Sequence, residues 1–396
     1  MISFETAFQK VLHFTLDWGE EKVSQLQANG RVLTEDIKAD RDFPPFDRST
    51  KDGIAINFSG IEKGLDIFKV EGILSAGMPQ QSLSSDTHCF EIMTGAVLPN
   101  NADTVIMYEE IEIEAQLANI SKRPKKGQNI HSKGSDEVKG AVLVEKGRII
   151  SPAIIGVLAS VGKSAVRVKK LPTVCVVSTG NELVEISEQP LPHQIRKSNT
   201  FSLIAALKKV NIEPTQLHLA DDRQLIENEL QKALSNHDVL MLSGGVSKGK
   251  FDFIPDALEA LGVEKIFHRI AQRPGKPFWF GITEKQKKVV FSFPGNPVST
   301  FANYHVYFLP WLAKSLRIET TKQSVFLDET ITPHPTLTLF LQVKTKFEKG
   351  CVIAKLIQGN GSGDLISLAK ADGFIRIPAG ETEFKKGSLF SFIPCT

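Results

Sequence analysis

The clearest structural signal in the sequence is the stretch Asp238-Val239-Leu240-Met241-Leu242-Ser243-Gly244-Gly245, a short apolar run that leads directly into a glycine-rich loop. Such a run predicts a buried strand, and residues 255–261 after the loop have the pattern of a helix. The same alternation continues on both sides. Strands are predicted at 173–177, 215–219, 278–280 and 289–291, and helices at 198–210, 222–234 and 298–313. This pattern implies a mostly parallel sheet covered by helices on both faces, and therefore a central three-layer α/β/α domain over residues 171–313.

The chain on the N-terminal side of this domain has a different texture. Residues 28–140 contain short apolar runs broken by Gly, Pro, Asn and Ser, which predicts a β-rich domain. Residues 4–27 have apolar side chains at helical spacing, and Pro152 begins a second helical pattern. We expect these two helices to pack against each other, so that residues 1–27 and 141–170 form one discontinuous helical domain.

The alternation of strands and helices stops after Lys314. Further strands are predicted at 340–344, 351–354, 374–377 and 389–392. The first two are joined by the turn Glu348-Lys349-Gly350. These patterns predict a C-terminal β-barrel-like domain over residues 325–396, so the whole chain is expected to be a multidomain α/β plus β protein.

The composition excludes several classes of protein. Lys and Arg total 47 and Asp and Glu total 45, so the formal charge is only +2, which argues against a dedicated nucleic-acid binder. The apolar fraction of 41% is that of an ordinary globular protein. No apolar run reaches the roughly 18–20 residues needed to cross a bilayer, and no export signal begins the chain. The four cysteines lack the spacing of a zinc or redox motif. We therefore expect a cytoplasmic protein with no membrane partner.

Four polar loops follow predicted strands of the α/β domain, where ligands bind in open parallel sheets. They are residues 178–182, 221–222, 243–249 with Asp252 just after, and 293–299. In the third loop Gly244 and Gly245 let the backbone approach an anion, and Ser243 and Ser247 add donors. A tight turn that needs positive φ explains the same glycines, and a rigid turn explains Pro294 to Pro297.

Charged residues of both signs accompany these loops. Arg273-Pro274-Gly275-Lys276-Pro277 places two cations around a stiff turn suited to a compact dianion, and Arg269 lies four residues earlier. Glu182, Asp221 and Asp252 stand beside turns expected to bind phosphate, where they would repel an anion unless a hard cation lay between. Mg²⁺ fits because it takes one or two carboxylates together with phosphate oxygens. A solvated basic turn and a helix cap at Asp221 are the simpler alternatives.

The N-terminal β-rich region also carries polar, glycine-bracketed turns. They are residues 44–53, 93–96 and 134–140. Each is either a surface turn or a binding loop, since binding groups concentrate on loops.

Taken in order, these strings resemble those of the molybdopterin molybdotransferases, the molybdenum-insertion enzymes related to the E domain of gephyrin. The resemblance covers nearly the whole chain. It includes Pro45-Phe46-Asp47-x-Ser49-x-x-Asp52-Gly53, the four loops of the α/β domain, the 273–277 turn, and Gly361-Ser362-Gly363 with Ser367 to Gly373. One Pro-Gly-Asn-Pro run would be weak evidence, whereas the ordered set is specific.

The resemblance implies an elongated homodimer with four domains per chain and a cleft between the α/β domain of one subunit and the N-terminal β-domain of the other. It implies insertion of molybdenum from molybdate into adenylylated molybdopterin, with Mg²⁺ present and AMP released. The pterin adenylyltransferase and molybdoenzyme acceptors are implied partners. Family site positions match Asp52, Thr94, Asp136, Glu182, Asp221, Asp252, Lys276, Pro294 and Pro297. We expect Arg273, Lys276 and the Ser299 hydroxyl to hold molybdate.

The sequence departs from the family pattern at four places. Ile54 stands where Tyr is usual and Lys51 where Met is usual. Asn181 replaces an Asp beside Glu182, and Arg occupies positions 269 and 273, where Lys is common. Arg keeps the charge but changes its geometry from a point to a fork. These changes leave the metal ligands and the choice between molybdate and tungstate open.

Other functions are weaker explanations of the same sequence. A pterin adenylyltransferase shares the α/β domain, but the additional β-domains argue against it. A non-catalytic pterin-binding scaffold is a second alternative, but the carboxylates and cations expected at one cleft count against a protein that only binds. An NAD-dependent oxidoreductase is least supported, because the glycine fingerprint and its ribose-binding acid are missing.

Overall fold

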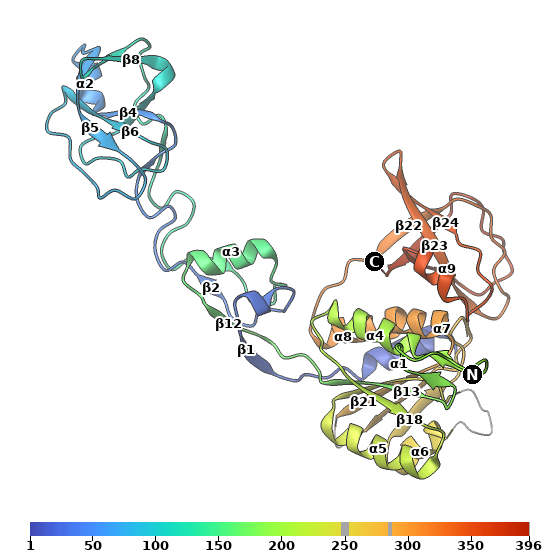
Figure 1. Cartoon of the computed structure of the whole chain (residues 1–396). Coiled ribbons are helices and arrows are strands. Elements are labelled where there is room, and N and C mark those ends of the chain that lie inside the picture. The colour runs from blue at the N-terminus through green and yellow to red at the C-terminus, as the bar shows by residue number, and fades with distance from the viewer. Residues whose placement is uncertain (247–252, 284–286, 396) are drawn as a thin grey trace. The chain divides into compact units, whose positions relative to one another are not determined.

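The computed structural model describes residues 1–246, 253–283 and 287–395, and it divides into two compact units (Figure 1). The larger unit comprises Met1–Lys22, Gly30–Val32 and Arg167–Thr396. The smaller unit comprises Val23–Asn29 and Leu33–Val166. No helix in the described part of the chain is long and apolar enough to span a membrane.

A six-stranded sheet in the order β16-β13-β17-β21-β20-β18 forms the centre of the larger unit. Its strands are β13 (Val174–Thr179), β16 (Thr215–Leu219), β17 (Val239–Ser243), β18 (Glu264–His268), β20 (Trp279–Thr283) and β21 (Lys288–Phe293). The neighbours β16, β13, β17 and β21 are parallel, whereas β20 is antiparallel to both β21 and β18. The predicted mostly parallel sheet is confirmed.

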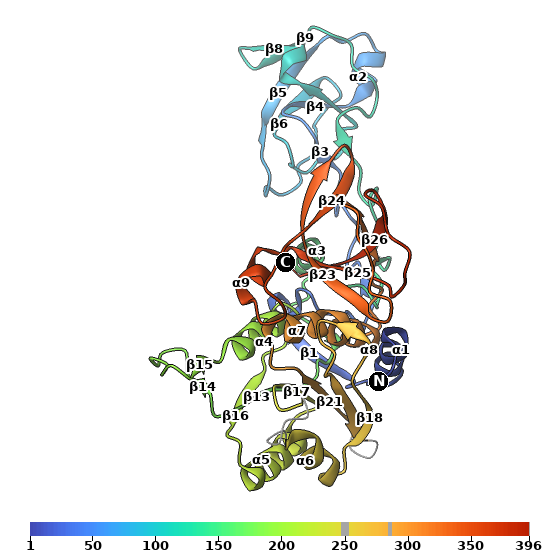
Figure 2. The same cartoon turned by 90° about the vertical axis from the view of Figure 1, so that its right-hand side faces the viewer.

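Helices cover both faces of this sheet, as Figures 1 and 2 show. Helices α5 (Arg223–Asn236) and α6 (Ile254–Ala260) pack on one face, where Cys175 and Val177 point. The other face receives Val174 and Val176. It is covered by α1 (Phe4–His13), α4 (Ser198–Lys208), α7 (Pro297–Asn303), the π-helical segment Tyr304–Phe308 and α8 (Leu309–Ser315). Because both faces are covered, β13 is apolar from Val174 to Val177, and the three-layer α/β/α prediction is confirmed.

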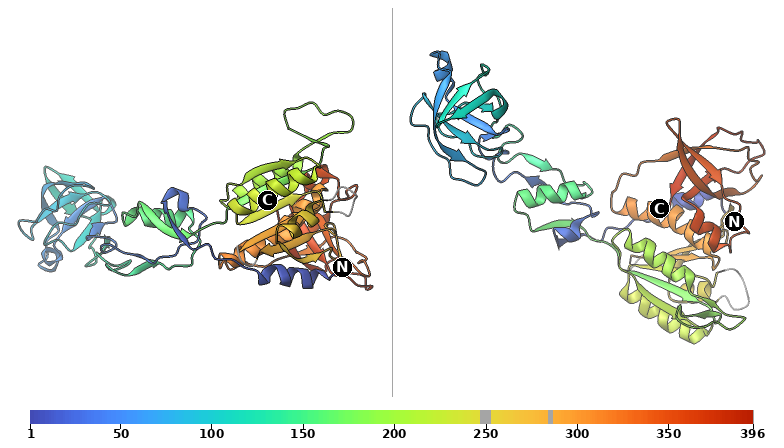
Figure 3. Two further views of the ribbon diagram at one scale, coloured as in Figure 1. Left: turned by 90° about the horizontal axis from the view of Figure 1, so that it is seen from below. Right: turned by 45° about the horizontal axis from the view of Figure 1, so that its top comes forward.

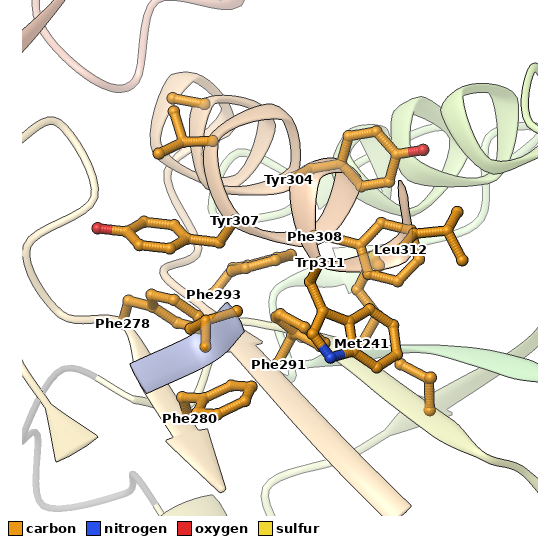
Figure 4. Packing of buried hydrophobic residues seen from close by; sticks show 14 of the residues in the cluster. Met241, Phe278, Phe280, Phe291, Phe293, Tyr304, Tyr307, Phe308, Trp311 and Leu312 are labelled. Atoms are coloured by element: carbon orange, nitrogen blue, oxygen red, sulfur yellow. The ribbon is translucent and has the colours of Figure 1, made fainter. Parts of the chain in front are cut away.

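An aromatic core fixes the helix pair α7 and α8 on the sheet (Figure 4). Phe291 lies 5.2 Å from Trp311 and Phe278 lies 4.9 Å from Tyr307, measured between ring centroids. All four side chains are fully buried. Burial of each large side chain contributes about 1.5–3 kcal/mol. The strands whose ends precede the polar loops are therefore held in place by this aromatic core.

Helix α1 is shorter than the predicted helical segment and packs elsewhere. The Trp311 indole N–H donates to the Phe14 carbonyl at 2.8 Å, and the Lys314 ammonium donates to the Leu12 carbonyl at 3.0 Å. Side chains of α8 thus satisfy the last carbonyls, and the helix ends at His13. The expected packing of the first helix on the helix after Pro152 was wrong, because α1 buries its apolar face in the larger unit (Figure 3). The other domain boundaries remain predictions.

The C-terminal region of the larger unit is a closed β-barrel. Its strands β22 (Gln323–Leu327), β23 (Thr338–Glu348), β24 (Cys351–Leu356), β25 (Gly373–Ile377) and β26 (Leu389–Pro394) close through the pairing of β23 with β25. Helix α9 (Leu365–Lys370) precedes β25. The short strand β19 (Gln272–Arg273) pairs in parallel with the start of β23, which attaches the barrel to the 273–277 turn. The barrel prediction is confirmed, although β22 was not predicted.

The smaller unit is built on a second six-stranded sheet, in the order β7-β4-β6-β5-β9-β8. Its strands are β4 (Gly53–Ile56), β5 (Ile67–Leu74), β6 (His88–Ile92), β7 (Thr104–Met107), β8 (Ile111–Glu114) and β9 (Leu117–Ile120). Ile54, Phe68 and Cys89 form part of its core. The predicted β-rich fold of this region is confirmed.

Short elements complete the chain. Helices α2 (Phe58–Glu62) and α3 (Pro152–Ser160) belong to the smaller unit, and Ser151 caps α3. Single 3-10 turns occupy Leu26–Ala28 and Tyr108–Glu110. The two-stranded pairs are β1 (Glu20–Ser24) with β12 (Ala165–Lys169), β2 (Ile37–Lys38) with β11 (Val142–Val144), β3 (Arg48–Ser49) with β10 (Ile130–His131), and β14 (Leu183–Val184) with β15 (Ile195–Arg196).

Candidate active site

Two adjacent pockets open on the larger unit at the carboxyl edge of the parallel strands. The first, which we call the glycine pocket, has a volume of about 500 Å³ and is lined by Gly180, Glu182, Lys197, Asp221, Gly244 and Gly245 among others. The second, the cation pocket, has a volume of about 590 Å³ and is lined by Arg273, Lys276, Ser299, Leu339, Gln342 and Ile357 among others. Pro277, Pro294 and Asn296 line both pockets and form their common wall.

Strand register brings the predicted loops together at the glycine pocket. Ser178 on β13 stands opposite Ser243 on β17, and Ser243 stands opposite Phe293 on β21. The three strands therefore end at one level, and the loops that follow them leave the sheet side by side. Pro294 and Pro297, predicted as site residues, both line this pocket.

The glycines of the middle loop are required by the backbone. Gly244 has φ +103° and Gly245 has φ +71°. A Cβ on Gly245 would lie 2.6 Å from a carbon of Ile254, and one on Gly244 would lie 2.9 Å from the Thr179 hydroxyl. The turn explanation for these glycines is therefore correct, and the same conformation places their backbone on the pocket wall.

Asn199 connects the loops of the glycine pocket, a role that the sequence did not reveal. Its side-chain amide donates to the Ser243 hydroxyl at 2.9 Å and to the Gly295 carbonyl at 2.6 Å. Asn199 does not cap helix α4, because Lys197 occupies the cap position, without a side-chain hydrogen bond. One side chain thus fixes the ends of β17 and β21 relative to the start of α4.

Two of the three predicted metal-binding carboxylates lie at this pocket. Asp221 accepts a hydrogen bond from the Asn181 N–H at 3.3 Å, while Asp222 caps α5 through the Leu225 N–H at 2.8 Å. Asp221 is therefore free of the capping role that offered the simpler explanation for it. The Glu182 carboxylate packs against Gly180 and occupies the space that a side chain at position 180 would need. Asp252 and Ser247 lie outside the described residues.

A buried cation also lines the glycine pocket. Lys197 is only 8% exposed and forms an ion pair with Glu185, whose pKa its hydrogen bond and charge lower. His218 lies behind the pocket within 3.1 Å of the Ser178 hydroxyl. Burial, with a contribution from Lys197, holds the pKa of His218 below its usual range. The sequence gave no signal for Lys197, because an isolated Lys before a helix is usually solvated.

The cation pocket lies between the 273–277 turn, the start of α7 and the barrel. Arg273 and Lys276 are exposed at its wall, and Ser299 on the first turn of α7 is only 3% exposed. Strands β23 and β24 supply apolar side chains such as Leu339, Leu341 and Leu356. Arg269 lines neither pocket, and its predicted role in anion binding remains a prediction.

The remaining predicted residues belong to the smaller unit. Asp52 accepts hydrogen bonds from the Thr94 N–H at 2.6 Å and the Thr94 hydroxyl at 2.7 Å, and the pKa of Asp52 is lowered chiefly by the backbone hydrogen bond. Asp136 lies 2.8 Å from the His131 imidazole. Of these three predicted site residues, Asp52 and Thr94 are therefore in direct contact, whereas Asp136 contacts His131.

Known proteins match this chain from one end to the other. Residues 2–162 match the MoeA N-terminal region (domain I and II), residues 175–314 match the probable molybdopterin binding domain, and residues 325–395 match the MoeA C-terminal region (domain IV). A molybdopterin molybdenumtransferase of Synechocystis sp. is 39% identical over 396 residues, which cover 99% of both chains. The chain belongs to the molybdopterin molybdenumtransferase family. The resemblance inferred from the sequence motifs is confirmed, as is the assignment to a family of transferases.

Further relatives agree on sequence and on fold. A molybdopterin molybdenumtransferase of Staphylococcus aureus is 31% identical over 404 residues, covering 99% of this chain and 95% of that protein. The crystal structure of a molybdopterin biosynthesis MoeA protein from Pyrococcus horikoshii has a TM-score of 0.80 at 32% identity, covering 100% of this chain and 99% of that one. This MoeA protein therefore shares the fold of the present chain.

Proposed function

We propose that this chain inserts molybdenum from molybdate into adenylylated molybdopterin, with Mg²⁺ bound and AMP released. The observation that carries this proposal is the common wall of the two pockets. Pro277, Pro294 and Asn296 separate a pocket of backbone amides and carboxylates from a pocket of fixed cations. Two substrates with different charge requirements can therefore lie next to each other, which is what a transfer between them needs.

The glycine pocket suits the adenylylated phosphates of the pterin substrate. Its volume of about 500 Å³ lies within the roughly 300–1,000 Å³ of small-molecule sites. Backbone at Gly244 and Gly245 allows close approach of an anion, and helix α4 begins at the pocket. The buried Lys197 also lines this pocket, where its charge is shared with Glu185.

The carboxylates at this pocket fit a magnesium ion better than they fit a closed metal cage. Across residues 1–246, 253–283 and 287–395 no group of three or more His, Cys, Asp or Glu side chains forms a metal cluster. Mg²⁺ does not need one, because it keeps several waters and takes only one or two carboxylates together with phosphate oxygens. Glu182 and Asp221 would hold it, and Asp252 remains a predicted third ligand. When bound, the ion would neutralise charge on the phosphates.

The cation pocket suits the molybdate dianion. Arg273 and Lys276 balance its two charges, and the buried Ser299 hydroxyl donates a hydrogen bond. Among the described residues, the common wall contains only Pro277, Pro294 and Asn296, and none of these is a strong nucleophile. The residues of the two pockets therefore act by positioning the two substrates and by neutralising charge as the bond to AMP breaks.

A turnover assay tests the proposal directly. The full chain is incubated with adenylylated molybdopterin, Mg²⁺ and molybdate, and AMP is measured. We expect AMP release that depends on molybdate. Incubation with ATP and bare molybdopterin is the control, since adenylylation in that reaction would favour an adenylyltransferase instead.

We further propose a cytoplasmic homodimer in which Asp52 and Thr94 of one subunit act with the pockets of the other. The support is that this hydrogen-bonded pair lies in a separate compact unit and uses an exposed carboxylate. Mixing Asp52→Ala and Lys276→Ala chains tests the idea. Mixed dimers would contain one intact cleft and recover activity, whereas sites built within one chain would recover none.

A further inference from the structure

We infer that Gln272, Asn303 and Tyr307 form a buried polar network that positions the 273–277 turn for oxyanion binding. The inference rests on the proposed function, since it assigns these side chains a role in the molybdate site. None of the three belongs to the predicted site residues. They act through Arg273 and Lys276 and are therefore positioning residues.

The network is a continuous chain of hydrogen bonds that ends on the turn. The Tyr307 hydroxyl donates to the Gln272 side-chain oxygen. The Gln272 side-chain amide donates to the Asn303 side-chain oxygen at 2.8 Å and to the Pro274 carbonyl at 2.9 Å. The Asn303 side-chain amide donates to the Gly275 carbonyl at 3.3 Å. Gln272 is 1% exposed, and Asn303 and Tyr307 are fully buried.

The direction of these bonds matters for an anion site. Carbonyl oxygens carry partial negative charge, and two of them lie in a turn that is proposed to bind a dianion. The network turns the Pro274 and Gly275 carbonyls toward the interior, while Arg273 and Lys276 remain exposed on the pocket. The two carbonyl groups that would repel an anion therefore point away from the pocket, while the two cations of the turn face the ligand.

At Gly275 the backbone of the turn packs directly against the side chains of the network. It has φ +90°, and a Cβ at this position would lie 2.7 Å from the Gln272 side-chain nitrogen and closer still to the Asn303 oxygen. The position therefore admits no side chain unless the network moves. Three polar side chains in this apolar core would be costly to bury without the hydrogen bonds that they make to one another and to the turn.

The segment that supplies Tyr307 has an unusual backbone. Tyr304–Phe308 is a π-helical turn between α7 and α8, a feature that is frequent at functional sites. Asn303 is the last residue of α7. Helix α7 also carries Ser299, so one helical element supplies both a wall of the cation pocket and the support behind the turn.

The same segment provides a matched control. Tyr304 and Tyr307 are both buried in the aromatic core, and their hydroxyls point in opposite directions (Figure 4). The Tyr304 hydroxyl has no hydrogen-bond partner within the described part of the chain. Tyr→Phe at each position removes one oxygen atom from similar packing, and only Tyr307→Phe breaks the network.

The test is steady-state kinetics of AMP release by the full chain. For Tyr307→Phe we expect the KM for molybdate to rise about tenfold, with kcat at saturating molybdate and the KM for adenylylated pterin within twofold of wild type. Tyr304→Phe should match wild type. Gln272→Met removes the bond to the Pro274 carbonyl and the links to Asn303 and Tyr307, with an apolar side chain of similar shape. It should raise the molybdate KM at least as much, and it serves as the second variant if Tyr307→Phe folds poorly.

A Lys276→Ala variant in the same assay separates the two proposals. An unchanged molybdate KM in Lys276→Ala would show that the oxyanion binds elsewhere, and the proposed function would fail at this pocket. A raised KM in Lys276→Ala combined with Tyr307→Phe behaving like Tyr304→Phe would overturn only the positioning role. A loss of kcat without a change in KM would also overturn it.

Discussion

The glycine turn at residues 243–245 and the cation turn at residues 273–277 stand on either side of Pro294, and they are held in different ways. Asn199 holds the glycine turn from the pocket side, and its own side chain lines the pocket. Gln272 and Asn303 hold the cation turn from the core, where Gln272 borders the cation pocket but is only 1% exposed and Asn303 is fully buried. A turn that presents its backbone to a ligand needs open space, whereas a turn that presents long charged side chains needs its backbone fixed from behind.

This difference predicts which substrate each change affects, and the carboxylates of the glycine pocket should show the largest effect. Replacing Glu182 and Asp221 together by Gln and Asn removes the two carboxylates in the described part of the chain that are proposed to hold Mg²⁺. We expect AMP release to fall roughly 100- to 1,000-fold, because charge on the phosphates is no longer neutralised. The molybdate affinity, measured by calorimetry, should change little.

Glu188→Gln is the matched control for the carboxylates. This acid belongs to the loop between β14 and β15, two strands labelled in Figure 2. It is exposed and lines neither pocket. It should release AMP at the wild-type rate. Equal losses in Glu188→Gln and in the double variant would mean that net charge, rather than the pocket, controls the reaction.

Two glycine substitutions compare the turns directly. Gly245→Ala forces a Cβ to within 2.6 Å of Ile254, and Gly275→Ala forces one to within 2.7 Å of Gln272. Each non-glycine residue at positive φ costs about 1–3 kcal/mol. We expect Gly245→Ala to raise the KM for adenylylated pterin and Gly275→Ala to raise the KM for molybdate, each roughly tenfold or more. A rise in the KM for the same substrate in both variants would contradict the proposal that each turn binds a different substrate.

Asn199→Ala should have a smaller effect. It leaves the Gly295 carbonyl and the Ser243 hydroxyl without their shared donor, at a cost of about 1–3 kcal/mol in the free energy of unfolding. The KM for adenylylated pterin should rise by severalfold, while the molybdate KM should stay near that of wild type. Urea denaturation together with the AMP assay measures both quantities, and an unchanged pterin KM would restrict Asn199 to a structural role.

Acid should lower the free energy of unfolding through a buried histidine. Burial lowers the pKa of His305, in the π-helical segment, to about 4 from an ordinary 6.5. The unfolded chain therefore binds this proton first, so the stabilisation is complete above pH ~6.5 and is lost as the pH falls toward ~4, a total of about 3 kcal/mol.

His305→Gln isolates this contribution. We expect its free energy of unfolding to fall less than that of wild type between pH 7 and pH 4.5, because Gln does not bind a proton. The carboxylates contribute equally to both curves, so the difference between the curves reports His305 alone. Parallel curves would show that His305 does not titrate in this range.

The fold and part of the site could be predicted from the sequence for a physical reason. Strands such as Val174–Thr179 are apolar on both faces, and parallel strands place the loops after them at one edge. Glu182, Asp221, Gly244 and Pro294 were therefore found without coordinates. Their roles in binding remain predictions.

The supporting residues could not be predicted in the same way. Gln272 is about thirty residues away from Asn303 and Tyr307 in the sequence, and hydrogen bonds between distant side chains leave no periodic pattern. Asn199 lies at the start of α4, where an Asn usually caps the helix, so its position in the sequence did not indicate a link between loops. The partner of helix α1 was also hidden, since an amphipathic helix shows that it packs but does not show against what.

The position of bound tungstate tests the division between the two pockets most directly. Crystals of the full chain soaked in tungstate would show the metal by its anomalous scattering. We predict one strong peak between Arg273 and Lys276, within hydrogen-bonding reach of Ser299 through the oxyanion oxygens. A peak beside Gly244 and Glu182, with none at the cation turn, would contradict the assignment of the oxyanion to the cation pocket.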